Sequence, residues 1–141
     1  MEIKQLSDTL YVCGQIQVSD IARLKDAGIT AVICNRPDGE GEGQPSSQQL
    51  AQACDQVGLD WLYLPAVPGQ LQQQQAEAFK QWRTHKAGPV LAFCRTGMRS
   101  TSLWALGEVA HSSVREVTES AQHIGYDLSG LAGQLADIQN A

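Results

Sequence analysis

The chain has 141 residues, with 10 basic and 15 acidic side chains and a formal net charge of −5. This length suits a single domain, which we expect to span residues 1–141, and the acidic balance argues against nucleic acid as the main partner. No apolar run approaches the ~18 residues of a membrane span, and no basic segment followed by an apolar stretch opens the chain. The sequence therefore predicts a cytoplasmic protein, without membrane association, whose four cysteines are free thiols.

Hydrophobic periodicity and turn residues predict an alternation of strands and helices. Four strands are predicted, over residues 9–13, 29–35, 61–64 and 89–93. Six helices are predicted between and after them, over residues 20–27, 46 or 47 to 57, 71–85, 99–110, 114–124 and 128–138. Such an order indicates an α/β fold, with a largely parallel sheet covered by helices on both faces.

Local signals define several of these helices. Ser19 is expected to cap the first helix, and Gly58 and Ser113 are expected to end the second helix and begin the fifth. The glycine-rich, acidic segment 37–47 is predicted to be a loop. In the third helix the face expected to point inward carries four residues, Leu71, Ala78, Phe79 and Trp82.

The most informative segment joins the fourth strand to the fourth helix. It begins with Cys94 and contains Arg95, Thr96, Gly97, Met98, Arg99 and Ser100. A cysteine between a strand end and a helix start lies near unpaired backbone N–H groups and the positive end of the helix dipole. These surroundings bind anions and stabilise a thiolate, and two arginines strengthen both effects. We therefore predict that Cys94 is a nucleophile in an anion-binding loop, with Arg99 as its main charged partner.

The simpler interpretation is a buried core cysteine, which is common. A core position, however, has no need of a polar, doubly basic loop around it. The remaining cysteines, Cys13, Cys34 and Cys54, show neither C-x-x-C spacing nor a histidine at zinc-site spacing, so no metal or other cofactor is expected. Cys13 and Cys54 are interpreted as core residues. Cys34 is either a core residue or a resolving thiol for Cys94.

Two further residues are candidates for secondary roles. Arg36 follows a predicted parallel strand at its carboxyl end, where ligands bind in such sheets, so it is either a third cation at the site or a surface arginine paired with Asp38 or Glu40. Asp38 is the one carboxylate near the motif that could replace a missing general acid. Ser100 is expected to hydrogen-bond the sulfur, to cap the following helix, or both.

Several segments of the chain resemble a known family. The chain is similar to the phosphatase-like domain of β-lactamase-hydrolase-like proteins, which is also catalogued as a sulfurtransferase family. The matching segments are LYVCGQ (10–15), AGITAVICNRPDGE (27–40), GQPSS (43–47), LPAVPGQ (64–70), GPVLAFCRTGMRSTSLWAL (88–106) and GYDLSGL (125–131). The resemblance implies the fold of cysteine-dependent dual-specificity phosphatases, a four- to five-stranded sheet with the nucleophile loop at the carboxyl end of a strand. It leaves the reaction undecided between phosphate and sulfur chemistry.

The loop departs from the tyrosine-phosphatase pattern, in which five residues separate the cysteine from an arginine and a histidine commonly precedes the cysteine. Here Ser100 occupies the arginine position, Arg99 comes one residue early, and Phe93 replaces the histidine. One residue corresponds to roughly 100° around a helix, so a grip tuned to one spacing needs a different loop shape. The sequence CRTGMRS more closely resembles the loop of single-domain rhodaneses, where a cysteine carries sulfur as a persulfide.

A phosphatase also benefits from a general acid that protonates the leaving alkoxide. In dual-specificity phosphatases this acid often lies in the loop after the preceding strand, but residues 65–70 contain no carboxylate. Sulfur transfer needs no such acid, because sulfite and thiolates are stable leaving groups.

The favoured function is therefore a cysteine-dependent sulfurtransferase that works through a Cys94 persulfide. The first alternative is a phosphatase that forms a phosphocysteine at Cys94, and the second is a non-catalytic anion- or redox-sensing module. The expected substrates are small anions, namely thiosulfate, a persulfide or a phosphate ester. The expected partners are a thiol acceptor or a persulfide-metabolising enzyme.

Overall fold

The computed structural model describes residues 1–141 and contains one five-stranded sheet at its centre. Its strands are β1 (Lys4–Gln5), β2 (Leu10–Cys13), β3 (Ala31–Cys34), β4 (Asp60–Tyr63) and β5 (Val90–Phe93). They lie in the order β1-β2-β5-β3-β4, and all neighbours run parallel except the β1–β2 pair. The prediction of a largely parallel α/β sheet is confirmed, and the short strand β1 is an addition that the polar residues at its position did not signal.

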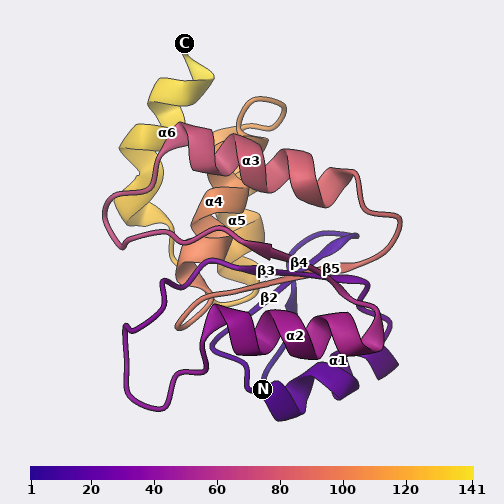
Figure 1. Ribbon diagram of the computed structural model, residues 1–141. Helices are drawn as coiled ribbons and strands as arrows, with labels where there is room; N and C mark the ends of the chain where they lie inside the picture. Colours follow the sequence, from indigo (N-terminus) through magenta and orange to yellow (C-terminus); the bar gives the residue numbers. More distant parts are fainter.

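Helices cover both faces of this sheet. They are α1 (Ile21–Asp26), α2 (Ser47–Val57), α3 (Gln73–Thr84), α4 (Met98–Glu108), α5 (Val114–His123) and α6 (Ala132–Gln139). Helices α1 and α2 lie on one face, below the strands in Figure 1, and α3 to α6 lie on the other. Two cores match these layers, since 12 buried residues lie between the sheet and the α1–α2 layer and 20 lie between the sheet and the remaining helices. None of these helices is both long enough and apolar enough to cross a membrane.

The middle of the sheet is fully buried because its strands carry no polar side chain. Every residue of β3 (AVIC) and β5 (VLAF) is buried, as expected for parallel strands covered on both faces. In the edge strand β4 no residue is fully buried: the two end residues are exposed and the two middle residues are half-buried. Strand β5 therefore holds its carboxyl end rigidly at the centre of the molecule.

Predicted helix ends agree with the structure where a strong cap is present. The hydroxyls of Ser46 and Ser113 accept hydrogen bonds from the amides of Gln49 and Glu116, and Gly58 ends α2 with a positive φ of 79°. The prediction for Ser19 is wrong, because Ser19 lies inside a 3-10 helix, Val18–Asp20, that precedes α1.

The inward face of α3 also differs from the prediction. Its buried residues are Ala76, Phe79 and Arg83, whereas Ala78 is exposed. The reason is an ion pair between Arg83 Nη2 and Glu108 Oε1 of α4, 2.6 Å long, which places the arginine on the packed face.

Candidate functional site

The carboxyl ends of the parallel strands meet at one edge of the sheet. The strands are in register there, since Cys13 and Cys34 both lie opposite Phe93, and Cys34 also lies opposite Tyr63. The next residues in each chain segment therefore converge, and Cys94 directly follows β5 at the centre of this edge. Ligands bind at this edge in open parallel sheets.

The Cys94 loop leaves several backbone amides without a hydrogen-bond partner. The amide of Gly97 donates to Cys94 Sγ at 3.1 Å, and α4 begins at Met98. The backbone amides of Arg95, Thr96, Arg99 and Ser100 donate no hydrogen bond within the chain. Unpaired amides at the start of an eleven-residue helix are available to an anion.

Gly97 shapes this loop. Its φ of 99° is in the left-handed region, and a Cβ at this position would overlap the hydroxyl of Tyr126. That hydroxyl in turn donates to the carbonyl of Thr96 at 2.8 Å. The segment after α5 thus supports the nucleophile loop from outside, and no pattern in the sequence had selected Tyr126 for this role.

Arg99 is held by a residue from a distant loop. Its Nη1 and Nη2 donate to the two carboxylate oxygens of Glu40 at 2.7 and 2.9 Å, and Nη1 also donates to the Ala66 carbonyl at 2.8 Å. The Arg36 Nε donates to Glu40 as well, at 3.0 Å, and its Nη1 donates to Gln15. Glu40 therefore joins two buried arginines, one that follows β3 and one in the first turn of α4.

These ion pairs shift the pKa of their members. The hydrogen bonds from Arg99, followed by those from Arg36, lower the pKa of Glu40 to about 2. The hydrogen bonds between Arg99 and Glu40, together with the neighbouring Cys94, raise the pKa of Arg99. At neutral pH Glu40 is consequently ionised and has no proton to donate.

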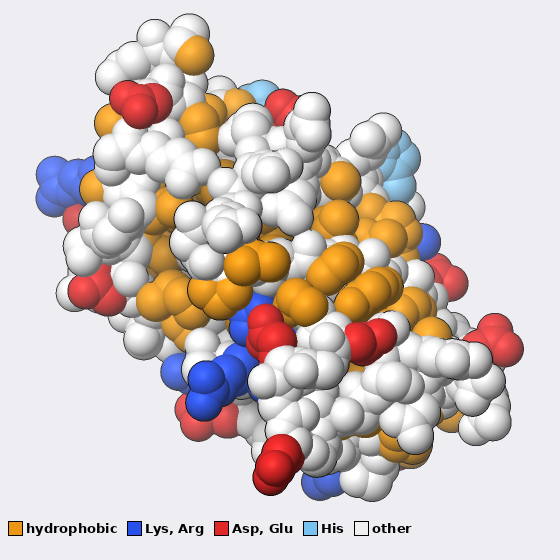
Figure 2. Space-filling model, turned by 60° about the vertical axis from the view of Figure 1, so that its left-hand side comes forward, with side chains coloured by type: hydrophobic (Ala, Val, Ile, Leu, Met, Phe, Trp, Pro, Cys, Tyr) orange, Lys and Arg blue, Asp and Glu red, His pale blue; other side chains and the backbone are white.

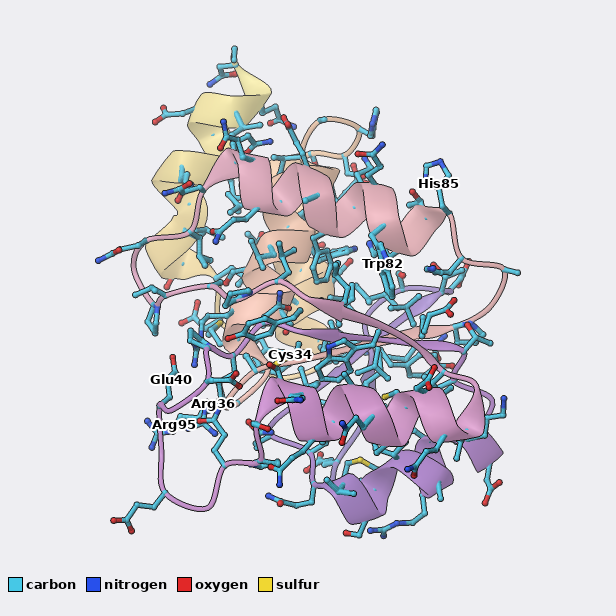
Figure 3. All side chains as sticks on the ribbon, in the orientation of Figure 1. Cys34, Arg36, Glu40, Trp82, His85 and Arg95 are labelled. Atoms are coloured by element: carbon cyan, nitrogen blue, oxygen red, sulfur yellow. The ribbon has the colours of Figure 1, made fainter.

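A cavity of about 690 Å³ lies over this cluster, which we call the anion cavity. It is lined by Arg36, Glu40, Gly41, Glu42, Pro68, Arg95, Thr96, Met98 and Arg99. Figure 3 shows Arg36, Glu40 and Arg95 together at this edge of the sheet. Trp82 and His85, at the carboxyl end of α3, lie far from them. The space-filling view shows a cluster of basic side chains (blue) next to acidic ones (red) (Figure 2). Cys94 is 1% exposed at the base of the loop, so its sulfur is sheltered from bulk water.

Arg36 is buried rather than at the surface, pairs with Glu40 and lines the anion cavity, and its role as a third cation for a bound anion stays a prediction. Asp38 does not face this cavity. Its carboxylate oxygens accept from the amide and the hydroxyl of Ser47 at the start of α2, so the structure contradicts its use as a substitute general acid.

Ser100 also has a different role from the one expected. Its hydroxyl is fully buried and donates to Asn35 Oδ1 at 2.8 Å, so its one proton is not available to the sulfur of Cys94. Asn35 in turn donates to the Leu64 carbonyl. Ser100 therefore joins α4 to the ends of β3 and β4.

The other three cysteines differ from Cys94 in their surroundings. Burial raises the pKa of Cys13 and of Cys34 to about 12, and that of Cys54 to about 11. The thiol of Cys34 donates to the Arg36 carbonyl at 3.3 Å. These groups stay protonated at neutral pH, which favours the interpretation of Cys34 as a core residue. No cluster of three or more His, Cys, Asp or Glu side chains is placed to hold a metal ion.

The sequence profile of the family described as β-lactamase hydrolase-like protein, phosphatase-like domain, matches residues 2–111. The chain belongs to this family. A β-lactamase hydrolase-like protein of Agrobacterium fabrum is 29% identical over 130 residues, which make up 91% of this chain and 30% of that protein. A relative from Xylella fastidiosa is 28% identical over the same shares. The chain thus spans under a third of the length of these curated relatives.

Solved structures support the same fold. A candidate phosphatase from Neisseria meningitidis is 34% identical, with a TM-score of 0.88 over 98% of this chain and 99% of that one. Tk-PTP in its active form is 15% identical, with a TM-score of 0.78 over 98% of this chain and 96% of that one. Kinase-associated phosphatase is 18% identical, with a TM-score of 0.75 over 100% and 97% of the two chains. The family domain therefore has a cysteine-phosphatase fold.

Proposed function

We propose that this domain is a sulfurtransferase in which Cys94 carries sulfane sulfur as a persulfide. The observation that supports this proposal best is which hydrogen-bond donors of the loop are free. Four backbone amides have no partner, whereas the guanidinium of Arg99 already donates to Glu40 and to the Ala66 carbonyl. A tyrosine-phosphatase arginine grips phosphate with two free N–H groups. A single charged sulfur needs only the amides, which suit it in number and position at a helix start.

The proposed reaction has two steps. The Cys94 thiolate attacks the outer sulfur of thiosulfate, a new S–S bond forms, and the original S–S bond breaks as sulfite leaves with its electron pair. A thiolate or cyanide then attacks the outer sulfur of the persulfide, takes it as a persulfide or thiocyanate, and restores the Cys94 thiolate. No oxidant or reductant enters either step. Arg36, Arg95 and Arg99 attract the anionic donor to the anion cavity.

The protonation state of the site agrees with this chemistry. Alkyl phosphate cleavage calls for an acid that protonates the leaving oxygen. The carboxylate next to Arg99 is Glu40, whose pKa of about 2 leaves it without a proton at neutral pH, and residues 65–70 carry no carboxylate. Sulfite leaves without a proton, so this site meets the needs of sulfur transfer.

Phosphate ester hydrolysis through a Cys94 phosphocysteine is the second candidate. The observation in its favour is the fold, together with the candidate phosphatase that is 34% identical over nearly the full chain. In this reaction a phosphate dianion would displace Glu40 from Arg99. An aryl phosphate is its most favourable substrate, because a phenolate needs protonation least.

Intact-mass spectrometry separates the two candidates. The protein is incubated with thiosulfate or with an aryl phosphate, and its mass is recorded before an acceptor is added. We expect the gain of one sulfur atom from thiosulfate, its loss on adding cyanide, and no gain in Cys94→Ser. Rapid aryl phosphate hydrolysis that depends on Cys94, with no sulfur bound from thiosulfate or an organic persulfide, would make phosphatase the correct assignment.

A further inference from the structure

A second hollow opens beside Arg99, with a volume of about 350 Å³. It lies between the 68–71 segment, the first turns of α4 and residues 127–134, and we call it the side groove. Its apolar walls include Leu71, Met98 and Leu131. Neither the loop chemistry nor a donor as small as thiosulfate makes use of this space.

The side groove adjoins the anion cavity, because both are lined by Pro68, Met98 and Arg99. Figure 2 shows apolar side chains directly beside a cluster of basic side chains. A ligand whose charged end lies among the arginines therefore has its next atoms at the mouth of the groove. Arg99 lies at the boundary between the charged anion cavity and the apolar side groove.

The walls select the kind of group that fits. Met98 is 36% exposed, and Leu71 and Leu131 are half-buried, so their apolar surface is open to a ligand. Covering such surface with carbon releases water and favours binding roughly in proportion to the area covered. An inorganic anion covers none of it.

We infer that the sulfur donor is an organic sulfane-sulfur compound with an apolar carbon group, which lies in the side groove while its charged end lies in the anion cavity. This inference rests on the proposed sulfurtransferase function and specifies its substrate class. For a thiosulfonate, R–SO₂–S⁻, the Cys94 thiolate attacks the terminal sulfur, the S–S bond to the sulfonyl group breaks, and the sulfinate R–SO₂⁻ leaves with the electron pair. An organic persulfide reacts in the same way and releases R–S⁻.

Two sulfur donors of equal charge, which differ only in their carbon group, test whether that group contributes to recognition. Benzenethiosulfonate carries an aromatic ring and methanethiosulfonate carries a methyl group, and both transfer the same sulfur. We expect kcat/KM for the benzene compound to be at least tenfold higher, since only its ring reaches Leu71 and Leu131. Equal values for the two donors would overturn the inference while leaving sulfur transfer in place.

A matched pair of glycines provides the variant and its control. Gly130 lines the side groove, whereas Gly133 does not, and a Cβ at either position meets no atom within 4 Å. Gly130→Phe should fill the groove, lower kcat/KM for benzenethiosulfonate at least fivefold and leave methanethiosulfonate within twofold. Gly133→Phe should leave both donors unchanged.

Binding of the leaving groups gives a readout without turnover. On the Cys94→Ser background, calorimetry should show tighter binding of benzenesulfinate than of methanesulfinate, and Gly130→Phe should remove the difference. If no donor transfers sulfur, the proposed function fails, but this measurement still tests whether the side groove binds an apolar carbon group. Equal affinities for the two sulfinates would show that it does not.

Discussion

Glu40 occupies the position in which a negatively charged substrate would meet Arg99. It binds Arg99 through both carboxylate oxygens and Arg36 through one, so the two arginines are aligned before any substrate arrives. The same contact places a negative charge beside the proposed binding site of the donor. Glu40 therefore has two opposite effects on anion binding. It favours binding because it aligns the two arginines, and it opposes binding because its negative charge competes with the anion for Arg99.

Glu40→Gln should tighten binding of thiosulfate to the Cys94→Ser protein by about three- to tenfold, a change of up to ~1.4 kcal/mol. The glutamine removes a negative charge but retains an oxygen that can accept from an arginine. Because the pKa of Glu40 is about 2, the carboxylate is ionised at both pH 5 and pH 8, and the difference between the two proteins should be the same at each. Isothermal titration calorimetry measures it.

Glu42→Gln is the matched control, since Glu42 lines the same cavity without pairing with an arginine. Its effect should be smaller than that of Glu40→Gln. Weaker binding in Glu40→Gln would show that alignment of the arginines outweighs competition.

At the scale of elements, the nucleophile loop depends on contacts from three segments around it. The 35–46 segment supplies Glu40, the start of the 64–72 segment supplies the Ala66 carbonyl, and the segment after α5 supplies Tyr126. The backbone of Gly14, after β2, also comes close, because a Cβ there would lie 2.8 Å from the Arg95 carbonyl oxygen. The β5–α4 loop is therefore packed on several sides and has little freedom to change its shape.

Gly97→Ala should destabilise the protein by about 2–3 kcal/mol, because a residue with a Cβ is strained in the left-handed region and this Cβ would overlap the Tyr126 hydroxyl. Sulfur loading should fall with it, since relief of the overlap moves the Thr96 carbonyl. Urea unfolding gives the free energy, and intact mass gives the loading.

Gly133→Ala is the corresponding control within α6, where space is open and φ is not positive. It should leave stability unchanged or raise it by up to about 1 kcal/mol, because alanine is the better helix former. A Gly97→Ala protein as stable as wild type would contradict the account of this turn.

At the scale of the molecule, all four cysteines are buried, but three of them share one core. Cys13, Cys34 and Cys54 belong to the core between the sheet and the α1–α2 layer. Cys13 and Cys34 end strands at the same edge as Cys94, but Cys94 alone begins the loop whose backbone amides are free.

Mild alkylation with iodoacetamide at pH 7 should therefore modify Cys94 first. Burial holds the pKa of the other three at about 11 to 12, and the thiolate is the reacting form. Intact mass should show one adduct in the folded protein, none in Cys94→Ser over the same period, and four in urea. A first adduct at Cys34 would instead assign that residue a redox role.

The sequence by itself determined the order of strands and helices, since apolar runs such as AVIC and VLAF need cover on both faces and Ser46, Gly58 and Ser113 mark helix ends. It also determined the position of Cys94 between a strand and a helix, because both elements are defined by local patterns. The short strand β1 was missed because its two polar residues carry no apolar alternation and form a strand only by pairing with β2. The packed face of α3 was missed because the partner of Arg83, Glu108, lies 25 positions away in the sequence.

Only the tertiary structure decided which polar residues meet at the site. Glu40 lies 59 positions from Arg99, in an acidic loop where Asp38, Glu40 and Glu42 look equally suitable in the sequence. Ser100 faces Asn35 across 65 positions, and the side groove forms where the 68–71 and 127–134 segments approach α4. Local sequence fixes the dihedral preferences of a segment, but the pairing of distant side chains depends on how the sheet edge brings the loops together.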